Sequence, residues 1–179
     1  MIFSPDLMKI LEECKPLGHK KMKNGTLLIG LNTEIRNDYW LHRLFTPLSN
    51  DSIISFEKES NLTFPSIYKT FLREYNGIFL FGGYFYIYGK SFLEKGMSRE
   101  EQLYQPYDLK EENEDPPLNI PGYLFYFGGS PNAIYVLDKN ENVIKLNRKS
   151  GKLIGKWETF KDCLTSEITK LHTENKYFK

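Results

Sequence analysis

The sequence predicts an α+β fold, in which helices pack against one side of a twisted, mainly antiparallel sheet. Three observations support this prediction. Residues 65–75 carry an apolar stripe at helical spacing, and the spacing changes to that of strands directly after Asn76 and Gly77. Further along, residues 133–137 and 143–147 flank a polar turn, which is typical of a β-hairpin.

The N-terminal part predicts one helix and one strand. A helix is expected to begin at Ser4, because a serine hydroxyl can cap it and Pro5 suits the first helical position. Three apolar side chains follow at helical spacing: Leu7, Leu11 and Cys14. A short strand is expected over residues 27–31. The secondary structure of residues 33–46 is left open, although their aromatic side chains must pack.

The middle of the chain predicts two helices and a pair of strands. Asn50 or Asp51 is expected to cap the first helix, and Pro65 to open the second. Gly77 ends the second helix, because glycine accepts the left-handed backbone conformation found there. Two apolar runs, residues 78–81 and 84–88, then flank a pair of glycines, which indicates a hairpin or a tight bend.

The C-terminal half predicts a long connection, three or more strands and a last helix. Residues 92–117 are rich in acidic side chains and are expected to form a surface connection that is helical near residues 99–104. A strand is expected over residues 123–127, followed by a turn at Gly128–Gly129, the hairpin, and a short extended piece between Gly151 and Gly155. Thr159 is expected to cap the last helix, with Asp162 three residues later.

Length and composition indicate a soluble domain in a reducing compartment. The 179 residues fit a domain over residues 44–179 with an N-terminal extension, residues 1–43, packed on it. A net charge of +1 argues against direct nucleic-acid binding. The two cysteines are far apart in sequence, no stretch reaches the roughly 18 apolar residues of a membrane span, and the N-terminus does not resemble a signal peptide. We therefore expect a cytoplasmic protein that contacts no membrane.

No pattern in the sequence predicts catalysis, a metal or a cofactor. The three histidines are scattered, and Cys14 lies near His19 without a second pair of ligands. Both cysteines end or line apolar helix faces and are expected in the core. Asp38 and His42 would form a surface ion pair if their segment were helical. The glycine pairs lack the spacing of a phosphate-binding loop. We expect no catalytic residue, so the chain is not predicted to be an enzyme.

Two groups of residues are candidates for binding a partner. The first is acidic with interleaved tyrosines: Tyr104, Tyr107, Glu111, Glu112, Glu114 and Asp115. A solvated loop is the simpler interpretation of this group. The second consists of tyrosines that alternate along a strand and so share one of its faces: Tyr84, Tyr86 and Tyr88. Burial in the core is at least as good an interpretation of the second group.

Several motifs, in order, resemble those of the SUKH superfamily. Residues 64–77 read FPSIYKTFLREYNG, which is similar to the superfamily's helix with its proline start and Asn-Gly stop. Gly128–Gly129 with the strand at residues 135–138, and the Trp-Glu-Thr-Phe at residues 157–160, are similar to its later elements. The resemblance covers about residues 44–171. Phe64 and Asn132 depart mildly from the superfamily's pattern, and the N-terminal extension is not covered.

The resemblance implies binding rather than catalysis. The superfamily includes bacterial immunity proteins and a yeast regulator of cell-wall assembly. The first implied function is that of an immunity (antitoxin-type) protein that binds and neutralises a cognate toxin domain. Such a toxin could be a nuclease, whose basic cleft the acidic residues and tyrosines would occupy. The alternative is a regulatory scaffold or adaptor of the cell-wall-regulator type. We expect a protein partner, and a monomer or weak homodimer.

Overall fold

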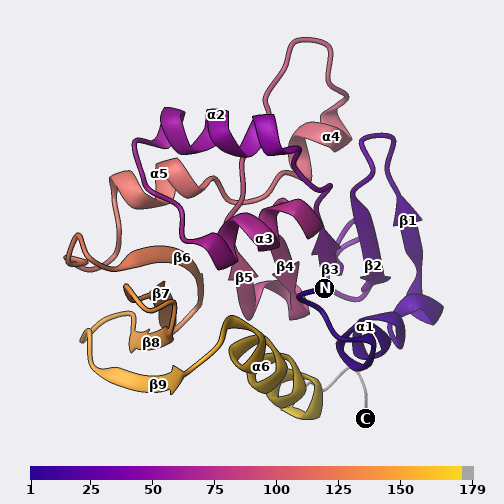
Figure 1. Ribbon diagram of the computed structural model, residues 1–179. Coiled ribbons are helices and arrows are strands. Elements are labelled where there is room, and N and C mark those ends of the chain that lie inside the picture. The colour runs from indigo at the N-terminus through magenta and orange to yellow at the C-terminus, as the bar shows by residue number, and fades with distance from the viewer. Residues whose placement is uncertain (175–179) are drawn as a thin grey trace.

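The computed structural model describes residues 1–174 and contains one open, strongly curved sheet of nine strands (Figure 1). The strands lie in the order of the sequence, β1 to β9, and each is antiparallel to the next. The predicted α+β fold with an antiparallel sheet is therefore confirmed. The last residues of the expected domain, 175–179, lie outside the described residues.

The N-terminal part contributes three strands to this sheet. Its elements are α1 (Pro5–Glu12), the 3-10 turn η1 (Lys15–Leu17), β1 (His19–Lys21), β2 (Leu27–Leu31) and β3 (Trp40–Leu44). Ser4 caps α1 as expected, and its side chain accepts a hydrogen bond from the Leu7 N–H at 3.3 Å. Strand β1 was not predicted, and β3 occupies the segment left open. The boundary expected between residues 43 and 44 falls inside β3, so residues 1–43 are part of the same sheet.

The middle part supplies two helices and two central strands. Its elements are α2 (Asn50–Ser60), α3 (Ser66–Glu74), β4 (Ile78–Leu80), the 3-10 turn η2 (Phe81–Gly83) and β5 (Phe85–Ile87). Ser49 caps α2, not Asn50 or Asp51, because its hydroxyl accepts from the Ser52 N–H at 3.1 Å. Gly77 has a φ of 85°, and a Cβ there would lie 2.9 Å from the Cβ of Pro106. Helix α3 already ends at Glu74, because Tyr75 after it is extended (φ −148°, ψ 127°). Gly77 therefore turns the chain toward β4 after the helix, and the prediction that it ends the helix is wrong.

The C-terminal half completes the sheet and adds three helices. Its elements are α4 (Arg99–Leu103), α5 (Leu109–Glu114), β6 (Phe125–Ser130), β7 (Ala133–Leu137), β8 (Val143–Asn147), β9 (Leu153–Trp157) and α6 (Phe160–Glu174). Helix α5 replaces part of the expected acidic loop, because the Asp108 side chain caps it by accepting from two backbone N–H groups. Thr159 accepts from the Asp162 N–H at 3.1 Å, as predicted.

The glycine pair of β6 does not form the expected turn. Gly128 and Gly129 lie within β6 and pair with Ile87 and Tyr86 of β5. A Cβ at Gly128 would lie 2.4 Å from the Tyr86 carbonyl oxygen, so no larger residue fits between these two strands. The glycines thus permit the close approach of two backbones, which is the other reason for glycine in a strand.

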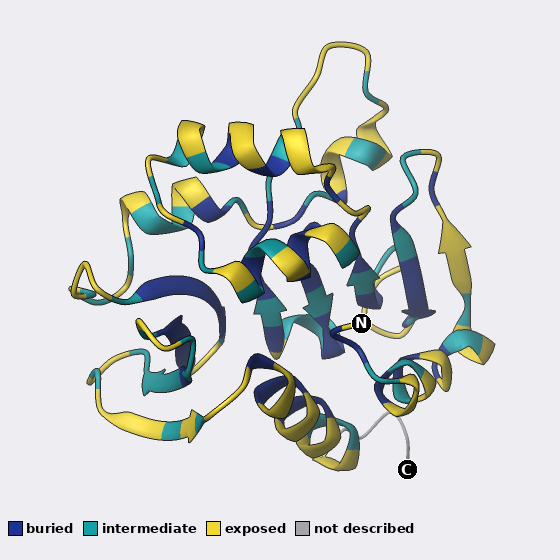
Figure 2. Cartoon of the chain, viewed as in Figure 1, coloured by how far each residue is buried: buried dark blue, intermediate teal, exposed yellow. Residues whose placement is uncertain are grey.

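One face of the sheet, here called the helical face, carries the main core (Figure 2). In the view of Figure 1, α3 lies in front of β4 and β5. The ring of Phe160 of α6 lies 5.7 Å from that of Phe71 of α3 and 5.1 Å from that of Phe127 of β6. These contacts join two helices and the sheet in one apolar cluster, and the burial of this cluster contributes most to the stability of the fold.

The segment that carries α4 crosses the other face of the sheet. Tyr104 packs in a second, small cluster with Trp40, Leu28 and Met22 of the first strands. The expectation that helices occupy one side therefore describes α3 and α6, whereas residues 92–108 cover part of the opposite side. Among residues 1–174, no helix is both long and apolar enough to cross a membrane.

Candidate protein-binding face

Three aromatic side chains gather on the face of the sheet opposite α3 and α6. Strand register places Phe79 of β4 opposite Tyr86 of β5, and it places Arg43 of β3 opposite Phe79. The side chains of Arg43, Phe79 and Tyr86 therefore point to the same side of the sheet. The ring of Tyr107 then packs against both aromatics, at 6.0 Å from Phe79 and 5.1 Å from Tyr86. We call Phe79, Tyr86 and Tyr107 the aromatic face.

The aromatic face is partly open to solvent. Tyr107 is 47% exposed, whereas Phe79 and Tyr86 are half-buried. Tyr84 follows the glycine turn, whose Gly83 lies against the Phe79 ring. The structure thus brings together two of the five tyrosines that the sequence singled out, Tyr86 and Tyr107, one from each candidate group, and it leaves Tyr84 exposed near the turn.

The other two tyrosines are buried and correct the prediction. Tyr88 is fully buried, and its hydroxyl is hydrogen-bonded to that of Tyr126. Tyr104 is only 2% exposed, and its hydroxyl donates to the Asp38 carbonyl at 2.9 Å. Since both side chains are in the interior with their polar ends satisfied, neither can contact a partner in this structure.

Two arginines that sequence reasoning missed flank the aromatic face. Nη1 of Arg148 donates to the Tyr86 hydroxyl at 3.1 Å. The guanidinium of Arg43 lies 4.5 Å from the centre of the Phe79 ring and 5.1 Å from that of Tyr104. Such contacts are favourable because the ring face carries negative charge. Arg43 was missed because residues 33–46 had no assigned period, so its side of the strand could not be deduced.

The acidic residues are those of α5 and Asp115 directly after it, and Glu112 is the one whose charge acts on Tyr86 of the aromatic face. Glu111, Glu114 and Asp115 are exposed, and Glu112 is half-buried. Burial raises the pKa of Tyr86; the charge of Glu112 adds to this shift, and Arg148 opposes it. The face therefore has cations on one side and carboxylates on another, a mixed pattern that suits a protein surface better than a polyanion.

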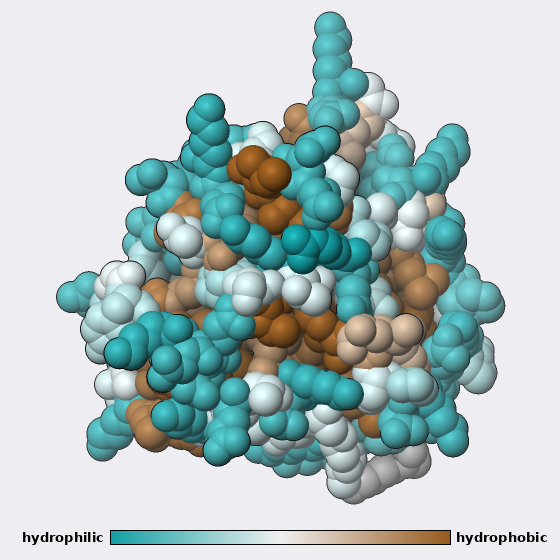
Figure 3. All heavy atoms as spheres, viewed as in Figure 1, coloured by the Kyte–Doolittle hydropathy of each residue, from teal (hydrophilic) through white to brown (hydrophobic). Residues whose placement is uncertain are grey.

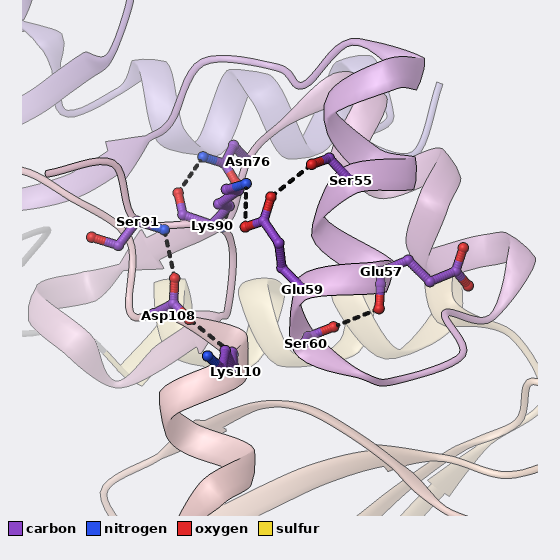
Figure 4. A network of polar contacts seen from close by, with 9 residues as sticks. All are labelled: Ser55, Glu57, Glu59, Ser60, Asn76, Lys90, Ser91, Asp108 and Lys110. Atoms are coloured by element: carbon purple, nitrogen blue, oxygen red, sulfur yellow. Dashed lines mark hydrogen bonds and ion pairs between the residues drawn. The ribbon is translucent and has the colours of Figure 1, made fainter. Parts of the chain in front are cut away.

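A network of polar contacts holds the main chain at Lys90 and Ser91, which lies near α2 and the start of α5 (Figure 4). Lys90 pairs with Glu59 of α2 at 2.7 Å, and the Ser91 N–H donates to the Asp108 carboxylate at 2.8 Å. Asn76 bonds both the N–H and the carbonyl of Lys90. Because the polar groups of this network are hydrogen-bonded or ion-paired with one another, its role is structural. It fixes the segment that leads to Tyr107 of the aromatic face.

The groove beside this segment is a second candidate. It encloses about 340 Å³ between residues 45–49 and 92–106. Its walls include Phe45, Phe92 and Met97, with Ser49 and Glu94 among its polar lining groups. Of these polar groups, Ser49 is already used as the cap of α2 and Glu94 is the one carboxylate of the lining, so the groove offers less chemistry for recognition than the aromatic face.

Cys14 and His42 form a buried contact that the sequence did not predict. Cys14 Sγ lies 3.2 Å from His42 Nε2, and the Phe81 N–H donates to His42 Nδ1 at 3.3 Å. Burial lowers the pKa of His42 to about 3 and raises that of Cys14 to about 12, so both groups are neutral at pH 7. The expected surface pair of Asp38 with His42 is wrong, because His42 lies in a strand and is fully buried.

The described residues contain no cluster of three or more His, Cys, Asp or Glu side chains arranged to hold a metal. On the side of the molecule seen in Figure 3, hydrophobic residues appear in small groups over α2 and α3, separated by hydrophilic ones.

Comparison with known protein families gives one match. The family described as SMI1 / KNR4 family (SUKH-1) matches residues 47–166. No curated protein matches the chain significantly. The matched range contains three aromatic residues of the face, at positions 79, 86 and 107, as well as the whole of α5, and it begins after Arg43.

Proposed function

The chain belongs to the SMI1 / KNR4 family (SUKH-1), and from this premise we propose that it is a non-enzymatic immunity protein of the cytoplasm, which binds a cognate toxin domain and neutralises it. The proposed functional unit is the domain over residues 44–179, and residues 1–43 complete its sheet. No turnover and no cofactor are needed for this function, since a tight complex alone would block or distort the toxin's active site.

The observation that carries the proposal is the packing of Tyr107 against Tyr86 on an open face. Tyrosines that are held in place by neighbouring rings lose little entropy on binding, and they dominate the energetics of many interfaces. Tyr86 is fixed further by its hydrogen bond to Arg148. A partner that covered Tyr107 and Tyr86 would bury two large side chains that are oriented before binding.

The carboxylates of α5 support a partner with a basic site. Glu111 and Glu114 lie on α5 and Asp115 directly follows it; all three are exposed, and Glu114 lies 3.7 Å from the Lys110 ammonium. Opposite charges across an interface speed association and align the partners before contact. A nuclease would present such a basic cleft, because it must bind phosphates.

The proposal is tested by co-expression with the C-terminal domain of a secreted protein encoded next to this chain. We expect that domain to stop growth, and this protein to restore growth and to co-purify with it at a fixed ratio. Tyr107→Ala should weaken the complex by about 2 kcal/mol, as expected for an interface anchor. Tyr123→Ala is the matched control, because Tyr123 is 73% exposed and lies outside the aromatic face.

Two outcomes would count against the proposal. If the neighbour's domain is toxic and both proteins are folded, but growth is not restored, the pairing is wrong and a regulatory scaffold becomes the better hypothesis. If growth is restored equally by the Tyr107→Ala and Tyr123→Ala variants, with unchanged affinity, the immunity function stands but uses another surface.

A further inference from the structure

Arg43 is a partly exposed cation without a counter-ion in residues 1–174. It stands in β3, outside the segment on which the family match rests. No Asp or Glu carboxylate of the described residues lies within ion-pair distance of it, and its Nε atom is buried without a hydrogen-bond partner. A buried polar nitrogen without a partner is uncommon and has a cost in free energy.

Two rings hold the guanidinium in place. Phe79 of β4 lies on it at 4.5 Å and Tyr104 at 5.1 Å, while Tyr104 is itself fixed by its hydrogen bond to the Asp38 carbonyl. The side chain is therefore oriented before any partner arrives. An arginine that is stacked in this way keeps its terminal nitrogens available in a rigid fork, which matches the two oxygens of a carboxylate.

The nearest carboxylate in sequence is already used. Asp38 forms an ion pair with Arg36, and Arg36 adds a like charge near Arg43. Burial lowers the pKa of Arg43, which shows that its environment penalises the charge. An anion bound from outside would relieve this penalty, and it would sit beside Phe79 on the aromatic face.

We propose that Arg43 binds an aspartate or glutamate side chain of a protein partner, in a two-pronged ion pair beside Phe79 and Tyr107. This inference rests on the proposed function, because it names a contact of the same face. A carboxylate fits better than a nucleic-acid phosphate. A phosphate backbone brings many negative charges, which the acidic residues of α5 and the chain's net charge of +1 do not favour.

The test uses the full chain and a displayed library of random short peptides, so it does not depend on any toxin. We expect the selected peptides to be enriched in Asp or Glu at a fixed position. For a synthetic peptide from that selection, Arg43→Gln should raise the dissociation constant about 10- to 30-fold, since a fork-like ion pair is lost. Arg43→Lys keeps the positive charge and the aliphatic part of the side chain. It should raise the dissociation constant by most of the same factor, because an ammonium group cannot form two parallel hydrogen bonds to a carboxylate.

Arg73→Gln is the matched control. Arg73 lies on α3, on the other side of the sheet, and its Nε donates to Asn50. It should bind the selected peptide as the natural chain does. Thermal unfolding of each variant shows whether it is folded. If the Arg43→Gln variant does not fold, the Arg43→Lys variant still tests the proposal.

Three results would overturn the proposal: selected peptides without acidic enrichment, equal peptide affinity of the Arg43→Lys variant and the natural chain, or a single-stranded oligonucleotide that binds tightly and loses this binding in the Arg43→Gln variant. The last result would assign the site to phosphate instead. Failure of the toxin co-expression with a positive peptide result would reject only the toxin pairing, so the two proposals fail separately.

Discussion

The side-chain amide of Asn76 encloses the main chain of Lys90. Its Oδ1 accepts from the Lys90 N–H at 2.6 Å, and its Nδ2 donates to the Lys90 carbonyl at 2.8 Å. The backbone N–H of Asn76 in turn donates to the Phe45 carbonyl. One residue thus ties the end of α3, the end of β3 and the segment after β5. This explains physically why the Asn-Gly pair after α3 contains asparagine and not merely any turn residue.

Asn76→Ala should therefore destabilise the protein by about 2 kcal/mol, because it leaves the N–H and the carbonyl of Lys90 without partners. Chemical denaturation would measure this change. Asn140→Ala is the control, since Asn140 lies in the exposed turn between β7 and β8 and should change the stability by less than about 0.5 kcal/mol. Equal effects of the two substitutions would contradict the role assigned to Asn76.

The buried His42 makes stability depend on pH. Its pKa is about 3 in the folded protein against 6.5 in the unfolded chain, so the unfolded chain binds more protons between these values. Stability is then fully present above pH 6.5 and is lost as the pH falls toward 3, with a slope of up to about 1.4 kcal/mol per pH unit. The neighbours that oppose its protonation include His172.

The variant His42→Gln isolates this contribution. It should be less stable than the natural chain at pH 7, yet lose about 2 kcal/mol less on going from pH 7 to pH 4.5. His19→Gln, at an exposed position, should keep the full slope. Denaturation curves at the two pH values give both numbers, and an unchanged slope in the His42→Gln variant would show that other groups dominate acid unfolding.

The ion pair of Lys145 with Glu167 connects β8 to α6. Lys145 Nζ lies 2.9 Å from both carboxylate oxygens, and the Tyr135 hydroxyl donates to Glu167 at 2.8 Å. Because Glu167 is buried, Lys145→Met should cost about 3 kcal/mol by leaving a charge without its partner. Replacing both residues by Met should cost less than this single change.

The exposed pair of Lys15 with Glu12 serves as the comparison. Its members are 37% and 49% exposed, and Lys15→Met should cost no more than about 0.5 kcal/mol. A double-mutant cycle, measured by chemical denaturation, gives the interaction energy of Lys145 with Glu167 and that of Lys15 with Glu12. If the double Met variant at positions 145 and 167 is as unstable as the sum of its single changes, the electrostatic explanation fails.

The order of elements could be predicted well from the sequence, because capping and periodicity act over a few residues. Ser4 and Thr159 each begin a helix through a contact within one turn. Strand β1 could not be predicted, since its three residues are exposed and polar and exist as a strand only by pairing with β2. Helix α5 was missed for a different reason: its cap, Asp108, lies in the acidic stretch of residues 92–117, which was interpreted as a surface connection.

The candidate site was less predictable than the fold. Alternation along β5 predicted one shared side for Tyr84, Tyr86 and Tyr88, but it could not show that Tyr88 meets Tyr126 and is buried. Arg43 and Phe79 join the site through register between β3 and β4, which depends on long-range pairing. Strand pairing of this kind cannot be deduced from a single sequence, so the position of Arg43 beside the aromatic face could not be predicted.

The last prediction concerns the acidic residues on and directly after α5, which should increase the rate of association with the proposed toxin. Replacing Glu111, Glu114 and Asp115 by their amides should slow association about tenfold at low salt and change dissociation little, because exposed charges act mainly by steering. The difference should shrink as salt is raised, since screening shortens the range of the field. Neutralising three exposed carboxylates on other elements, Asp6, Asp51 and Glu158, changes the net charge equally and is the control. If both triple variants associate at the same rate in a stopped-flow measurement, the net charge steers the partner and α5 has no special place in recognition.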